Sequence, residues 1–94
     1  MKHSVGDYVT IQSQDWYDAN KSEDGAVYEK DEHGNPILND QFPFSKEMAS
    51  NNFWEEVVRV FEVDEVNRIY RLGNGLEFYR FREDHLCQFS IDKD

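Results

Sequence analysis

Hydrophobic and polar residues alternate with a period of two in several short stretches, and the first of these covers residues 5–11. Val9 and Ile11 lie two residues apart, so they share one face of a predicted strand. Residues 13–18 follow, and Ser13 is placed to cap a single helical turn. The start of the chain therefore predicts a short strand and then a short helical turn.

The C-terminal half carries the clearest strand pattern, with β-branched and aromatic residues gathered in short runs. These runs predict strands over residues 56–63, 66–72, 76–81 and 86–91. In the second of them, one face holds Val66, Arg68, Tyr70 and Leu72. Gly-Asn-Gly at residues 73–75 is the strongest turn signal, because Asn-Gly readily adopts positive φ, and it predicts a hairpin. Residues 82–85 are polar and predict a turn before the last strand.

The most polar part of the chain is residues 18–41. Residues 26–29 and 36–38 could pair as a small hairpin across the turn at 31–35, and partial disorder is the alternative.

A short helix is predicted within residues 42–53, with Ser45 as its N-cap. Met48 occupies the position where a full capping box would have Glu or Gln.

Several short strands with tight turns and little helix predict a mainly β fold, closed or nearly closed into a barrel. Ninety-four residues suit one domain, spanning residues 1–94. A chain of this size needs large side chains for its core, and seven Phe, five Tyr and two Trp supply them.

Acidic residues outnumber basic ones by twenty to ten, which gives a formal net charge of -10. This charge favours solubility and repels phosphate backbones and anionic membrane surfaces. One local basic face is conceivable, because four arginines flank the predicted hairpin: Arg68, Arg71, Arg80 and Arg82. The alternative interpretation makes them cross-strand partners of nearby acids.

Cys87 is the single cysteine, so no disulfide can form within the chain. It lies in the apolar stretch 86–89, which favours a packed, small hydrophobic side chain. Strand alternation would put His85 and Cys87 on one face, but a nucleophile also needs a third group to orient its base. We expect no catalytic residue and no enzymatic activity.

Two metal-site patterns are incomplete. The spacing of a calcium loop is imitated by Asp18, Asn20, Ser22 and Glu29. Glu23 stands where that loop requires glycine, and no flanking helices are predicted. The possible zinc ligands are scattered along the chain at His3, His33, His85 and Cys87. We expect neither a metal nor another cofactor.

Recognition is the role that remains, because a small domain cannot readily hide all of its rings. The candidate partner-binding residues are Trp16, Tyr17, Trp54 and Tyr79. In the alternative interpretation, Trp16 and Trp54 close the ends of the core.

Three segments resemble those of small SH3-like barrels: VGDYVTI at 5–11, IYRLGNG at 69–75 and FREDHL at 81–86. In such barrels, a short 3₁₀ turn joins the last two strands at the third segment. The chain is also similar to small uncharacterised proteins of phage and bacterial genomes, through WYDANK at 16–21 and FSKEM at 44–48. Those proteins have glycine after the helix, where this chain has Phe-Trp. The resemblance implies an SH3-like barrel of about five antiparallel strands with a polar insertion near residues 18–41, and it implies no function.

The sequence therefore predicts a non-catalytic binding or adaptor module that contacts a protein partner. Two alternatives stay open: an acidic decoy that inhibits a nucleic-acid-binding protein, and a weak nucleic-acid binder that uses the four arginines. The start of the chain lacks the apolar run of a signal peptide, and no stretch approaches a membrane span. We expect a cytoplasmic monomer or weak dimer.

Overall fold

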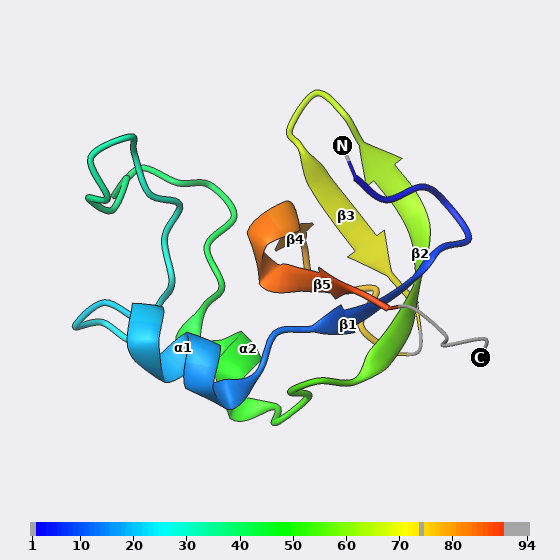
Figure 1. Cartoon of the computed structure of the whole chain (residues 1–94), viewed down its shortest axis with the longest axis horizontal. Helices are drawn as coiled ribbons and strands as arrows, with labels where there is room; N and C mark the ends of the chain where they lie inside the picture. Colours follow the sequence, from blue (N-terminus) through cyan, green and yellow to red (C-terminus); the bar gives the residue numbers. More distant parts are fainter. Residues whose placement is uncertain (1, 74, 90–94) are drawn as a thin grey trace, which may run out of the picture.

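The described part of the chain has five antiparallel strands and two short helices, whose arrangement Figure 1 shows. This computed structural model describes residues 2–73 and 75–89. The elements are β1 (Tyr8–Ile11), α1 (Gln14–Asn20), α2 (Lys46–Ser50), β2 (Val57–Asp64), β3 (Ile69–Leu72), β4 (Phe81–Arg82), a 3₁₀ turn (Glu83–His85) and β5 (Leu86–Gln88). The mainly β class is confirmed, as is the 3₁₀ turn. Neither helix of the described chain has the length and apolar character that crossing a bilayer requires.

Strand β2 belongs to both halves of the sheet, whose order is β4-β3-β2-β1-β5. Its first half pairs with β1 and its second half with β3, with a register shift between Val60 and Glu62. Such a bulge bends a strand and increases its twist. The half of the sheet that contains β1 and β5 therefore lies at an angle to the half that contains β3 and β4 (Figure 1). Within the described ranges, β4 and β5 have one neighbour each. The sheet is therefore not closed, and the expected barrel closure is not observed.

Alternation along β1 and β2 places the core as the sequence predicts. Val9 and Ile11 of β1 are buried, as are Val58 and Val60 of β2. The residues between them face outward, which is the usual pattern of an antiparallel sheet with one covered face.

The core is rich in aromatic rings, and its residues come from β1 to β5 and from both helices. Its largest fully buried side chains are Tyr70, Phe44, Phe81, Ile11, Leu72, His85, Val9, Val58 and Val60. Phe44 precedes α2, and its ring lies 6.5 Å from that of Phe81 in β4. Burial of each large apolar side chain stabilises the fold by about 1.5–3 kcal/mol.

Both predicted helix caps are confirmed. The Ser13 Oγ accepts a hydrogen bond from the Trp16 N–H at 3.2 Å and starts α1. The Ser45 Oγ accepts from the Met48 N–H at 3.1 Å and starts α2. The Met48 sulfur completes the capping box weakly, because it accepts the Ser45 N–H at 3.5 Å.

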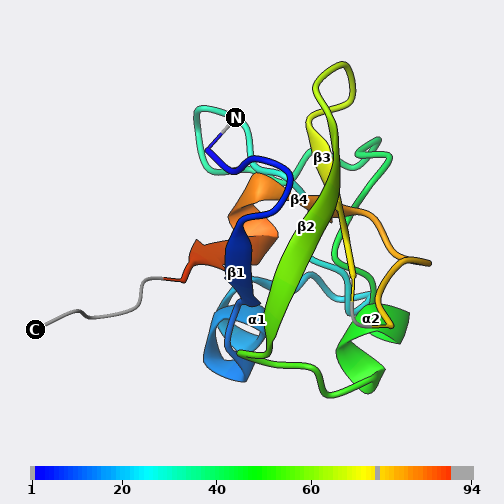
Figure 2. The ribbon, with the colours of Figure 1, turned by 90° about the vertical axis from the view of Figure 1, so that its right-hand side faces the viewer.

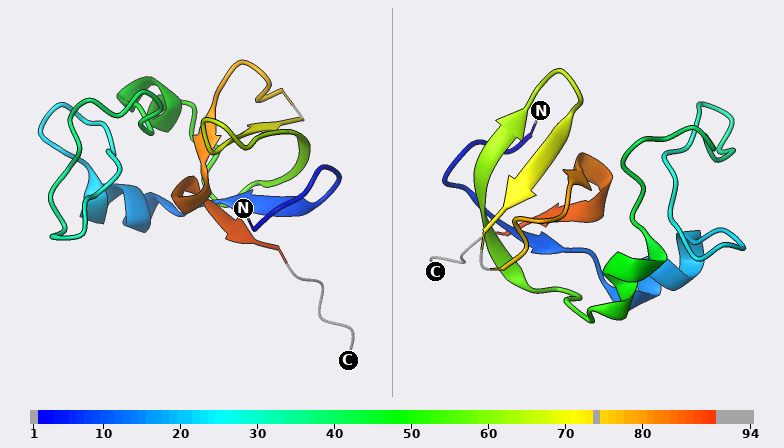
Figure 3. Two further views of the ribbon diagram at one scale, coloured as in Figure 1. Left: turned by 90° about the horizontal axis from the view of Figure 1, so that it is seen from above. Right: turned by 180° about the vertical axis from the view of Figure 1, so that it is seen from behind.

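Residues 21–45 leave the sheet between the two helices, and we name this segment the excursion; Figure 3 shows it to one side of the strands. The structure describes all of it. The turn predicted at 31–35 forms, and the Asp31 carboxylate accepts N–H bonds from His33 and Asn35 at 2.9 Å each. The hairpin arms are shorter than predicted. Lys30 pairs with Pro36, whereas Val27 pairs with Phe44.

The predicted strand over 66–72 begins later than expected, and β3 starts at Ile69. Val66 and Arg68 are exposed in the preceding turn, so they do not share a face with Tyr70. The cause is the Asp64 carboxylate, which accepts N–H bonds from Val66 and Asn67 at 3.1 Å and turns the chain.

The return strand predicted over 76–81 is mostly irregular, and only Phe81 and Arg82 pair with β3. Successive turns replace it, with N–H bonds from Leu76 to Gly73 and from Tyr79 to Leu76. Asn74, at the centre of the predicted turn, lies outside the described residues. So does the end of the predicted strand 86–91, beyond residue 89.

The prediction of a packed Cys87 is wrong. Leu86 faces the core, so alternation along β5 directs Cys87 to solvent. His85 lies in the 3₁₀ turn and is fully buried, so His85 and Cys87 do not share a face.

Candidate functional site

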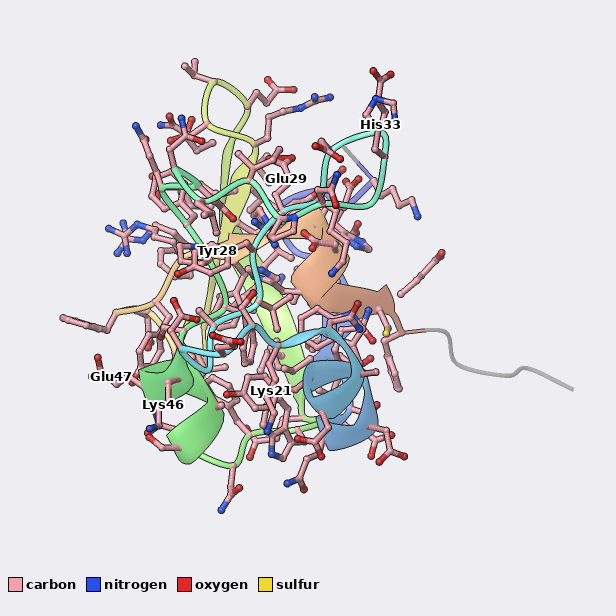
Figure 4. The ribbon with its side chains drawn as sticks, turned by 90° about the vertical axis from the view of Figure 1, so that its left-hand side faces the viewer. Lys21, Tyr28, Glu29, His33, Lys46 and Glu47 are labelled. Carbon is pink, nitrogen blue, oxygen red and sulfur yellow. The ribbon has the colours of Figure 1, made fainter. Side chains whose placement is uncertain are left out.

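A groove of about 1230 Å³ lies between the excursion and one end of the sheet. One wall consists of excursion residues, including 27–30 and 39–42. The other wall consists of the β2–β3 turn at 66–68 and residues 82–84 at the 3₁₀ turn, and α1 adds Trp16 and Asn20. Figure 4 shows Tyr28 and Glu29 on the excursion, with His33 at its tip. We refer to this feature as the groove.

A buried ion pair joins the two walls. The side chains of Arg82 and Asp40 are 8% and 5% exposed, and the guanidinium Nη1 contacts the Asp40 carboxylate. Asp40 also accepts N–H bonds from Glu29 and Phe42 at 2.9 Å each, which fixes the excursion around it. The excursion is therefore attached to the sheet by this buried ion pair.

Asp84 completes the surroundings of Arg82. Its two carboxylate oxygens accept hydrogen bonds from Nε and Nη2 of Arg82, both at 2.9 Å. Burial raises the pKa of Asp84, but the hydrogen bonds and charge of Arg82 outweigh it, so the pKa lies below its ordinary value. This bidentate geometry holds the guanidinium in one plane.

His85 lies behind this pair in a cage of rings. Its Nδ1 accepts the Arg82 N–H at 3.0 Å, and its ring lies 5.3 Å from Phe44 and 6.0 Å from Trp16. Burial lowers the pKa of His85 to about 3, so the imidazole is neutral at pH 7. Its Nε2 has no hydrogen-bond partner within the described part of the chain. The Phe44 ring lies nearly perpendicular to the imidazole, with an angle of 80° between the two planes.

Lys2 and His3 are held by hydrogen bonds beside the groove. Glu83 accepts the Lys2 N–H at 2.6 Å and the Tyr70 hydroxyl at 2.9 Å, and Tyr70 accepts the His3 N–H at 3.1 Å. The Lys2 hydrogen bond lowers the pKa of Glu83, and burial raises the pKa of Tyr70. Both groups keep their usual charge at neutral pH.

Tyr28 is oriented by its neighbour on the excursion. Its hydroxyl donates to the Asp24 carboxylate, and this hydrogen bond lowers the pKa of Asp24. Together with Trp16 and Phe42, Tyr28 gives the groove three partly buried rings.

The four aromatic residues predicted for partner binding all pack against the core, and the structure does not place them on one surface. Trp16 lines the groove, with its ring 5.5 Å from Phe44. Tyr17 is buried against Trp54, with ring centres 5.3 Å apart. Tyr79 is partly buried and accepts a hydrogen bond from Asn51 at 2.9 Å.

The four arginines predicted as a basic face have separate surroundings. Arg68 lines the groove from the β2–β3 turn. Arg71 pairs with Glu62 at 3.0 Å across the strands, as the cross-strand interpretation predicted. Arg80 donates to the Phe78 carbonyl at 3.1 Å, and Arg82 is buried.

Two residues of the incomplete calcium-loop pattern are part of a helix. Asp18 and Asn20 lie within α1, and the Asn20 side chain donates to the Trp16 carbonyl at 2.7 Å. Across residues 2–73 and 75–89, no cluster of three or more His, Cys, Asp or Glu side chains has a metal-binding arrangement.

Sequence reasoning missed Asp40, Tyr28, Phe42 and His85 as parts of this region. Asp40 is one acid among many in a polar segment, so the sequence carries no signal for its burial. For His85 the sequence carries a weak signal of burial, since this residue directly precedes an apolar stretch.

No protein-family model matches this chain, and the searches of curated proteins and of solved structures also gave no match.

Proposed function

We propose that this chain is a non-catalytic protein-binding module that holds an extended segment of a partner protein in the groove. The observation that carries the proposal is the combination of a large open groove, three partly buried rings and walls joined by Arg82 and Asp40.

The size and the lining of the groove favour a polypeptide ligand. Its volume exceeds the 300–1000 Å³ or so of a typical small-molecule pocket. Trp16, Tyr28 and Phe42 offer contact area for apolar side chains, and aromatic residues are enriched at interfaces. Lys30 and Glu29 add both signs of charge at the rim. An extended segment with apolar and polar side chains matches this mixture.

The titratable groups around the groove support the non-catalytic part of the proposal. The pKa values of Glu83 and Asp84 lie below their ordinary values, so neither is prepared to act as an acid at neutral pH. His85 is sealed behind rings and stays neutral. General acid–base catalysts usually have pKa values near the working pH.

We also propose that the sheet belongs to the SH3-like class. The strand order, the sharing of β2 between two halves and the 3₁₀ turn between β4 and β5 support this assignment.

The test begins with a photo-crosslinker, p-benzoylphenylalanine, at position 42 in the groove and, as a control, at position 78. Phe78 is exposed and does not line the groove. We expect protein adducts in the source cell from position 42 only. The crosslinked segment is then synthesised and titrated calorimetrically against the folded protein.

Truncation of a groove ring should weaken binding of that peptide at least about tenfold, as for a hot-spot residue. Trp16→Ala and Tyr28→Ala are the groove variants; Tyr28 lies outside the core cluster, so its truncation keeps the fold. Phe78→Ala is the matched control. Equal adducts at both positions, or unchanged affinity in Tyr28→Ala, would contradict the proposal.

A further inference from the structure

The outward side of β1 and β2 carries an apolar surface away from the groove. Tyr8, Val57 and Phe61 are 53%, 43% and 41% exposed there, although their sequence neighbours Val9 and Val58 are buried. Figure 2 shows β1 and β2 side by side, with the excursion behind them. We name Tyr8, Val57, Arg59 and Phe61 the outer face. Outward positions of such a sheet are usually polar, so three apolar residues here require an explanation.

Arg59 lies within the outer face and stacks on a tyrosine ring. It is the cross-strand partner of Tyr8, and its guanidinium lies over the Tyr8 ring at 5.9 Å. Gly6 lies beside it, and a Cβ at Gly6 would be 3.6 Å from Nη2, at ordinary van der Waals distance. No carboxylate of the described residues reaches ion-pair distance of Arg59. A stacked guanidinium loses little conformational freedom when it binds a carboxylate.

Arg71, on the neighbouring strand β3, differs from Arg59 because it already has a carboxylate partner. Arg71 also lies over a ring, at 5.0 Å from the centre of Phe61, but Glu62 already pairs with it at 3.0 Å. Among the four residues of the outer face, Arg59 is the one that carries a charge, whereas the whole chain has a formal net charge of -10. The outer face is thus an apolar surface with one positive charge that pairs with no carboxylate of residues 2–73 and 75–89.

We propose that the outer face is a second docking surface, which binds a partner segment that carries a carboxylate between apolar side chains. The carboxylate pairs bidentately with Arg59, and the apolar side chains cover Tyr8, Val57 and Phe61. Tyr and Arg are among the residue types that most often dominate binding energy. With the groove on the other side of the sheet, the chain would then join two partners.

Other occupants fit these charges less well. A symmetric dimer through this face would bring two Arg59 charges into one interface, and the outer face itself holds no carboxylate to pair with them. A nucleic acid would meet one accessible guanidinium and strong repulsion from the remaining acids. Both occupants are included as outcomes of the test.

The experiment is a ¹H–¹⁵N NMR titration of the full chain with two synthetic peptides. One is acetyl-Val-Glu-Phe-Glu-Val-amide, and the matched control has Lys in place of both Glu. We expect the acidic peptide, at millimolar concentration, to shift the amide signals of Tyr8, Val57, Arg59 and Phe61. The Lys peptide should leave them unchanged. An absence of shifts with the acidic peptide at 5 mM or so, or equal shifts with both peptides, would overturn the proposal.

Two variants separate the role of the guanidinium from general effects. Arg59→Gln removes the charge at an exposed position and should weaken binding of the acidic peptide at least about tenfold. Arg80→Gln, outside the outer face, should retain the affinity of the wild type. Equal binding by Arg59→Gln would exclude the carboxylate contact. A dimer that Arg59→Glu dissociates in sedimentation, or the same signals shifted by oligo(dT), would assign the face to another occupant.

Discussion

Arg82 and Asp40 form an ion pair that excludes solvent and joins the end of the sheet to a segment on the far side of the groove. The two residues come from opposite halves of the sequence. Asp84 binds the same guanidinium in a bidentate manner, so one arginine organises both walls.

Removal of the Asp40 charge should strongly destabilise the fold. Loss of one partner of a buried pair costs about 3–5 kcal/mol, and Asp84 still compensates part of the charge, so we expect about 3 kcal/mol for Asp40→Asn. Urea unfolding followed by fluorescence measures the loss. The half-exposed Arg71–Glu62 pair is the control, and Glu62→Gln should cost less than about 1 kcal/mol. Equal losses in both variants would show that Asp40 has no special role.

Stability should decrease on mild acidification because of His85. Its pKa is about 3 in the folded chain and near the ordinary 6.5 when unfolded. Between these values, the unfolded chain binds a proton that the folded chain excludes, so acid favours unfolding. The stability that neutral, buried His85 contributes is fully present above about pH 6.5, and it is lost as the pH falls toward 3. From pH 7 to 5 it amounts to about 2 kcal/mol.

The His85→Gln variant tests this pH dependence. Glutamine can still accept the Arg82 N–H but does not titrate, so its unfolding free energy should fall less between pH 7 and 5. His3 and His33 are present in both proteins and cancel in the comparison. If wild type and variant have the same slope, His85 is not the group responsible.

Ser13 and Ser45 should each contribute about 1 kcal/mol through their caps. Ser13→Ala and Ser45→Ala should lower the unfolding free energy by about that amount, whereas Ser13→Asp and Ser45→Asp should preserve it. Chemical denaturation of the four variants measures this. A loss in the Asp variants as large as in the Ala variants would contradict the capping explanation.

Cys87 should react rapidly with a thiol reagent such as DTNB in the folded state, because its side chain faces solvent from β5. We expect a rate close to that of the unfolded chain. Cys87→Ser should change stability by less than about 0.5 kcal/mol, as for an exposed substitution. If the reagent labels Cys87 only after urea has been added, the thiol is packed in the folded state, as the sequence analysis expected.

The features that sequence reasoning predicted correctly depend on nearby residues. Val9 and Ile11 follow from strand alternation, and the Ser13 and Ser45 caps follow from hydrogen bonds that span three positions. The prediction failed at Val66, where a strand-forming residue lies in a turn that the Asp64 carboxylate sets.

The candidate site was harder to predict because it rests on a contact between distant segments. Asp40 resembles every other acid of its polar segment, and only the fold brings Arg82 to it. Trp16 was predicted for partner binding and does line the groove, but its role in binding stays a prediction. Arg59 lies in a clear strand pattern, yet only the assembled strands show that it stacks on Tyr8 and that no carboxylate of the described residues pairs with it.

The turn at the tip of the excursion is a suitable site for inserting extra residues. Asp31 closes this turn with its own hydrogen bonds, and Gly34 has open space around it. Because Asp40 anchors the excursion at its base, extra residues inserted between His33 and Gly34 need not disturb the sheet. An affinity tag or fluorophore could therefore be placed there, leaving both chain ends and both proposed surfaces untouched.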